Sequence, residues 1–162
     1  GVNTNSYVSE DADNQGGFAY SPGAGASTTN ADGKVTLRSY GSMTYAGLLA
    51  LIYAQVDAQD VRVQAAKDWA SRHWSLDENP GMGQEGLYYF FNVLTKTLAA
   101  AGDETLTLPD GRVVVWREEV ARKLLALQKP EGFWVNENNR WWEADPNLVT
   151  AYTLLALSAA RQ

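Results

Sequence analysis

Hydrophobic residues recur at three- and four-residue steps in five stretches of the chain, a spacing that predicts five α-helices. Three of these stretches, near residues 43–56, 84–101 and 146–157, are apolar on nearly every face. The two stretches between them, near 61–72 and 117–128, have an apolar stripe on one side and charged side chains on the other. Because the two kinds alternate, we expect two layers, with the apolar helices inside and the amphipathic helices outside.

The remaining segments follow no helical period. Residues 1–41 are rich in Gly, Ser, Thr, Asn and Asp, so we expect a loop-rich N-terminal segment packed on the same domain as the repeats of residues 42–162. Between residues 105 and 115, two short apolar stretches flank Pro109-Asp110-Gly111 and predict one short β-hairpin. The expected fold class is therefore all-α, with a long N-terminal loop and one hairpin.

Composition excludes several classes of function. The 162 residues carry 13 Lys and Arg against 19 Asp and Glu, a net charge of −6, and no basic run that would bind phosphates, so nucleic acid is excluded as a partner. The chain has no Cys and one His, His73, so we expect no metal and no cofactor. The longest mostly apolar run, residues 45–56, is too short to cross a bilayer. We expect a soluble protein outside the cytoplasm of a bacterium, and the start at Gly1 leaves open whether a signal peptide was removed.

A repeat of roughly fifty residues relates the three apolar helices. Gly- and aromatic-rich segments precede them, and the clearest of these, Gln128-Lys129-Pro130-Glu131-Gly132-Phe133-Trp134, reads QxxxGxW. This resembles the QW motif of the squalene cyclase and protein prenyltransferase β-subunit superfamily, in which Gln caps a helix end and Trp stacks on it. Residues 79–89 and 141–146 are similar to segments of bacterial prenyltransferase/squalene oxidase repeat proteins. The resemblance implies an α/α toroid-like arc, a partial toroid because five helices are too few to close a ring.

The chain departs from the catalytic motifs of that superfamily. A class II terpene cyclase needs a DxDD acid at the start of an inner helix, where this chain has Pro146-Asn147-Leu148-Val149. The acids of Asp11-Ala12-Asp13-Asn14 lie outside any expected inner helix and are typical of an Asx-rich turn. A protein prenyltransferase holds zinc with Asp, Cys and His, and the chain has no Cys.

In such a fold, the N-terminal ends of the inner helices and the loops before them rim a central cavity, where we expect the site. Glu85 opens an apolar helix, so it is either a proton donor with a raised pKa or a first-turn acid favoured by the helix dipole. Glu143 has no evident local role, and both catalysis and structure remain open for it. Asp145 is expected to cap the last helix. The predicted catalytic residues are Glu85 and Glu143; the predicted ligand-binding residues are Tyr45, Gln84, Tyr88, Trp141, Trp142, Asp145 and Tyr152.

The abundant aromatic residues have two interpretations, a ligand cavity or packing between repeats. We expect packing for Trp69, Trp74, Trp116, Phe133 and Trp134. The leading hypothesis is a non-catalytic repeat domain that binds an apolar ligand, either isoprenoid, lipid-like or peptide, in an aromatic groove. The alternative is a terpene cyclase or prenyl-transfer enzyme with noncanonical carboxylates. The apolar edges of the arc, at the helices of Tyr45 and Tyr152, predict self-association or contact with the remainder of a longer chain.

Overall fold

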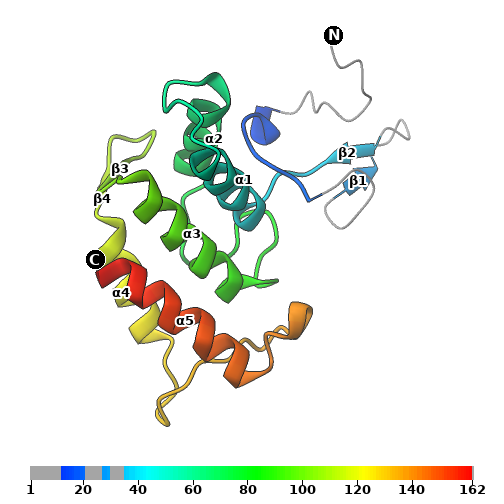
Figure 1. Cartoon of the computed structure of the whole chain (residues 1–162). Coiled ribbons are helices and arrows are strands. Elements are labelled where there is room, and N and C mark those ends of the chain that lie inside the picture. Colours follow the sequence, from blue (N-terminus) through cyan, green and yellow to red (C-terminus); the bar gives the residue numbers. More distant parts are fainter. Residues whose placement is uncertain (1–11, 21–26, 30–34, 162) are drawn as a thin grey trace.

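The computed structural model describes residues 12–20, 27–29 and 35–161, and it is mostly helical (Figure 1). Five α-helices lie in this part of the chain, in the five stretches that the periodicity indicated. They are α1 Gly41–Tyr53, α2 Val61–Arg72, α3 Leu87–Ala101, α4 Trp116–Ala126 and α5 Pro146–Arg161. Of these described helices, none has the length and hydrophobicity needed to cross a membrane.

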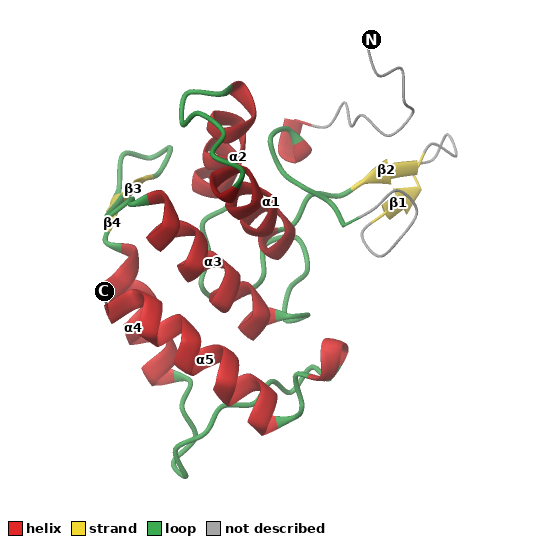
Figure 2. Ribbon diagram, viewed as in Figure 1, coloured by secondary structure: helices red, strands yellow, loops and turns green. Residues whose placement is uncertain are grey.

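Short strands and turns connect the helices (Figure 2). The predicted hairpin is confirmed: β3 Leu106–Thr107 pairs antiparallel with β4 Val113–Val114. A second antiparallel pair, β1 Ser27–Thr29 with β2 Val35–Leu37, lies in the N-terminal segment and was not predicted. One 3-10 turn, Ala12–Asn14, precedes the first pair, and another, Arg140–Trp142, precedes α5.

The helices pack in two layers. Helix α3 packs against both α1 and α5, so these three apolar helices form one row (Figure 1). Helix α2 packs on α1, and α4 packs on α5, so each amphipathic helix covers one of the two end helices of that row. Helix α3 is buried on most of its surface because it has a neighbour on each side, whereas α5 leaves Leu154 and Leu155 half exposed.

The third helix begins later than its hydrophobic pattern indicated. We expected it to start near Gln84, but it starts at Leu87. Gly86, immediately before it, has φ 65°, a left-handed conformation that glycine adopts at little cost and that ends the preceding turn. The three residues before α3 therefore belong to a loop.

Tryptophans join the layers, as predicted for packing residues. Trp69, Trp116 and Trp134 are buried, and each indole Nε1 donates a hydrogen bond to a backbone carbonyl, at 2.6 to 2.7 Å. Trp74 and Phe133 are only partly buried. The details of the QW-like motif differ from expectation, because the Trp134 indole, and not Gln128, bonds a carbonyl of the last turn of α4, that of Leu124. The Gln128 amide donates to the Gly132 carbonyl within its own loop, at 3.1 Å.

The described part of the N-terminal segment covers the outer edge of α1. The ring of Phe18 lies so close to Gly47 that a Cβ there would come within 2.5 Å of it, so the contact requires glycine. The Phe18 amide donates to Thr44 Oγ1 at 3.0 Å. The expected apolar edge at the helix of Tyr45 is therefore occupied by the chain itself, and Tyr45 is buried. In the part of the chain that the structure describes, the α5 edge of the row keeps the predicted exposure.

Candidate functional site

The loop before α3 is held rigidly against the start of α1. The Asn79 amide donates to the Gly83 carbonyl at 2.8 Å and closes a tight turn. The buried Asn79 side chain accepts from the Ser42 amide at 2.9 Å and donates to the Glu85 carbonyl at 3.0 Å. Because one amide side chain bonds both elements, the loop and the N-terminal end of α1 form one surface.

Glu143 is bound to the N-terminal end of α3. Its side chain is fully buried, and its two carboxylate oxygens accept from the backbone amides of Tyr88, at 3.2 Å, and Tyr89, at 2.8 Å. The Asn136 side-chain amide donates to the same carboxylate at 2.8 Å. The carboxylate therefore caps α3, a structural role that nothing near it in the sequence indicates.

The environment of Glu143 has opposing effects on its pKa. Burial raises the pKa above its ordinary value of 4.5, because a charge is poorly solvated there. The hydrogen bonds from Asn136 and the amides of α3 act in the opposite direction, because they stabilise the charged form. Burial is the larger effect, so the net shift is upward. The neighbouring Tyr88 hydroxyl is also affected, and burial followed by the Glu143 charge raises its pKa to about 12.

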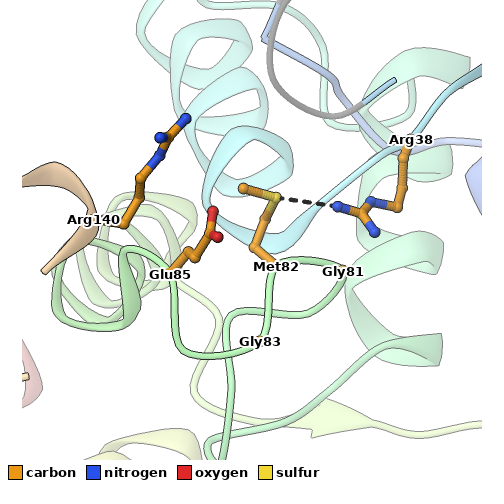
Figure 3. A pocket seen from close by; sticks show the side chains of 6 residues that line it. All are labelled: Arg38, Gly81, Met82, Gly83, Glu85 and Arg140. Atoms are coloured by element: carbon orange, nitrogen blue, oxygen red, sulfur yellow. Dashed lines mark hydrogen bonds between the residues drawn. The ribbon is translucent and has the colours of Figure 1, made fainter. Parts of the chain in front are cut away.

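A polar pocket of about 410 Å³ opens beside this cap (Figure 3). Two arginines, Arg38 and Arg140, line it together with Glu85. Arg38 contacts the Met82 sulfur at 3.5 Å, and the Arg140 guanidinium lies 4.7 Å from the centre of the Trp141 ring. The complete lining is Arg38, Gly81, Met82, Gly83, Glu85 and Arg140.

Trp141 and Trp142, which follow Arg140 of the pocket in the chain, are exposed in a costly backbone conformation. Both have φ 61°, in the left-handed region, where a non-glycine residue costs about 1–2 kcal/mol. Their exposed fractions are 51% and 75%, so burial of the rings does not offset this cost. Trp141 lies over the pocket's loop, since a Cβ at Gly86 would come within 3.3 Å of its ring. Strained, exposed aromatic residues of this kind are typical of binding sites.

The structure brings together some of the predicted site residues and separates others. Glu85 lines the pocket, and Trp141 lies over the pocket's loop. Trp142 is exposed and follows Trp141 in the chain. Gln84 is exposed, and its side chain donates to the Asp77 carbonyl at 2.8 Å. Asp145 is at the start of α5, where its carboxylate accepts from the Asn147 amide at 2.9 Å, as expected of a cap.

The predicted aromatic groove does not form from the tyrosines. Tyr45 and Tyr88 are buried, and neither contributes to the surface of the pocket. Tyr152 is partly buried and packs edge-on against Tyr89, with ring centres 5.9 Å apart. These side chains belong to the core because α3 has neighbours on both sides. The exposed aromatic surface near the site instead comes from Trp141 and Trp142.

Sequence reasoning missed both arginines of the pocket. Arg38 and Arg140 lie 102 residues apart, and the sequence offers no reason to pair them, although Arg140 directly precedes the predicted site residues Trp141 and Trp142. The glycines of the pocket, Gly81 and Gly83, lie within residues 79–89, which the sequence analysis singled out, and both have positive φ. Only their abundance in one short segment indicated a constrained loop.

Comparison with protein-family models, with curated proteins and with solved structures finds no match for this chain. In residues 12–20, 27–29 and 35–161, no group of three or more His, Asp or Glu side chains is placed to hold a metal ion.

Proposed function

We propose that this chain is a non-catalytic repeat domain, similar to part of the α/α toroid of terpenoid cyclases and protein prenyltransferases, that binds a ligand with an apolar portion. The row of α1, α3 and α5 with α2 and α4 outside supports the toroid-like arrangement. The observation that carries the binding function is the pair Trp141 and Trp142, exposed in left-handed conformation directly after Arg140, which lines the pocket. The ligand classes that fit the two indole rings are isoprenoid, lipid-like and peptide molecules.

The binding function predicts that Trp142→Asn weakens binding of an apolar probe such as farnesol or decanol by about tenfold, because an indole contact of this size is worth about 1.5 kcal/mol. Asn tolerates the left-handed region, so the free energy of unfolding should stay within about 1 kcal/mol of the parent value. Titration calorimetry measures the affinity, and urea denaturation measures the stability.

A matched control is Tyr53→Asn, which removes an equally exposed aromatic ring at the C-terminal end of α1, the end away from the site. This control should leave probe affinity unchanged. Equal affinity of the Trp142 variant and the parent for both probes would contradict the proposed function.

The alternative proposal, an enzyme of the terpene cyclase or prenyl-transfer type, is favoured by one observation: Glu85 lines the pocket. Glu143 supports it less, because both of its oxygens already accept hydrogen bonds from α3. Incubation with prenyl diphosphates distinguishes the proposals. Products that form with the parent protein and disappear in Glu85→Gln would establish the enzyme.

The exposed face of α5 supports the proposal that two copies of the chain pair. Leu154 and Leu155 are 55% and 50% exposed, and Ala151 continues their stripe by one turn. A hollow of about 440 Å³ extends this face, lined by Phe133, Pro146, Asn147, Thr150, Ala151 and Leu154. The α1 edge is covered by Phe18, so pairing would join identical α5 faces and close as a twofold dimer.

Pairing predicts a concentration-dependent mass in sedimentation equilibrium at micromolar protein. Leu154→Glu should yield a monomer at every concentration, because a charge cannot be buried unpaired at the centre of the interface. A surface change elsewhere, Arg122→Gln on α4, serves as the control. A parent protein that sediments as a monomer throughout would overturn the proposal.

A further inference from the structure

Within the part of the chain that the structure describes, the two arginines of the pocket are not held by a carboxylate, unlike the cations that form ion pairs. Four cations have ion-pair partners at 2.7 to 3.1 Å: Arg62 with Asp60, Lys67 with Asp103, Arg112 with Glu119 and Lys123 with Asp77. Among the described residues, neither Arg38 nor Arg140 has a carboxylate within 4.0 Å, although the chain as a whole has a net charge of −6. Arg38 contacts a thioether and Arg140 an indole ring, so both guanidinium groups keep free donors.

The arrangement of charges favours an anion of one negative charge. Figure 3 shows Arg38 and Arg140 on opposite sides of the pocket, with Glu85 and Met82 between them. Two positive charges and one negative charge leave the pocket with a net charge of +1. A carboxylate matches this charge, whereas a phosphate or diphosphate group brings further negative charge close to Glu85.

We propose that the pocket binds the carboxylate of an amphipathic carboxylic acid, whose apolar portion lies on Trp141 and Trp142. This assignment rests on the binding function proposed above and adds the chemistry of the ligand's polar end. Arginine is the side chain best suited to it, because its planar donors match the two oxygens of a carboxylate. The Trp141 ring, in contact with Arg140, places the apolar surface directly next to the charged one.

Three probes with the same alkyl chain test the assignment: decanoate, decanol and decyl phosphate. The parent protein should bind decanoate at least about tenfold more tightly than decanol, the effect of one good charge-assisted contact. Decyl phosphate should bind more weakly than decanoate. Titration calorimetry at low and high salt measures all three, and only the affinities of the two anions should fall with salt.

Charge variants separate the contributions of Arg38, Arg140 and Glu85 to the affinity for each probe. Arg38→Gln should weaken decanoate about tenfold and leave decanol unchanged. Arg140→Lys keeps the charge while Arg140→Gln removes it, so the difference between them isolates charge from the contact with Trp141. Glu85→Gln should raise the affinity for decyl phosphate more than that for decanoate. Arg122→Gln, on the outer helix α4, is the matched control and should change none of these affinities.

The outcomes distinguish the two proposals. Equal affinity for decanoate and decanol, unchanged in Arg38→Gln, would overturn the carboxylate assignment and leave the apolar binding function intact. Tighter binding of decyl phosphate than of decanoate by the parent would overturn the assignment in favour of a phosphate ligand. If neither decanoate nor decanol binds, both proposals fail.

Discussion

Replacing Glu143 with Ala should lower the free energy of unfolding by about 3 kcal/mol or more, because it leaves several buried donors without an acceptor. Those donors are the backbone amides of Tyr88 and Tyr89 and the side-chain amide of Asn136. The site lies wholly inside the protein, so water cannot replace the lost carboxylate without entering the core. Urea denaturation followed by circular dichroism measures the change.

Glu143→Gln is the informative companion, because it preserves the shape and keeps one acceptor oxygen. We expect Glu143→Gln to lower the free energy of unfolding by less than Glu143→Ala does. A loss equal to that of Ala would show that the charge is essential and not the acceptor alone. A near-neutral Ala variant would contradict the capping role altogether.

Comparison of the parent protein with Glu143→Gln at several pH values reports the direction of the Glu143 pKa shift. Its pKa is raised in the folded state by burial, so the folded protein binds the proton more tightly than the unfolded chain does. The stability contributed by this difference is fully present below about pH 4.5, the ordinary value, and is lost as pH rises through the folded pKa. Gln does not titrate. The free energy of unfolding of the parent, minus that of Glu143→Gln, should therefore fall as pH increases from about 4.5.

Trp134→Ala should cost about 3–5 kcal/mol of stability, the range for removing a buried large aromatic side chain. The ring is 3% exposed and lies at the junction of α4 and α5. Its Nε1 donates to the Leu124 carbonyl at 2.7 Å, and its backbone amide donates to Thr150 Oγ1 at 3.2 Å. The truncation therefore leaves a cavity and also frees a carbonyl in the last turn of α4.

Two variants define what Trp134 contributes. Trp134→Phe keeps most of the apolar volume and removes only the hydrogen bond, with an expected loss of about 1 kcal/mol from that bond alone. Trp142→Ala removes an indole that is 75% exposed and should change stability by less than about 1 kcal/mol. If Trp134→Ala unfolds at the same urea concentration as the parent, the assignment of this residue as the anchor between α4 and α5 is wrong.

The helical layers were predictable because the information for them is local. A helix buried on several sides must be apolar on several faces, so the pattern around Leu94 indicates a central position before any neighbour is known. Helix α5 has a similar pattern but lies at the edge of the row, with Leu154 and Leu155 half exposed. An amphipathic helix has one solvent-exposed face, and the charged residues around Val120 indicate such a face for α4. Asp145 was correctly identified as a cap because the group that it caps is two residues away. The edge of α1 was not predictable in this way, because the segment that covers it, at Phe18, follows no periodic pattern.

The candidate site was only partly predictable because it depends on contacts between distant segments. Glu143 bonds amides of α3 that precede it by 54 and 55 residues, and no local pattern indicates which helix end a buried acid will reach. Arg38 and Arg140 likewise meet at one pocket only because the loop before α3 lies between them in space. The sequence by itself determined the five helices, their alternation and the buried tryptophans, since periodicity and side-chain size act within each segment. The tertiary structure alone decided which polar groups became buried and bonded, and that Arg38 and Arg140 line one pocket, since those outcomes depend on the packing of segments far apart in the chain.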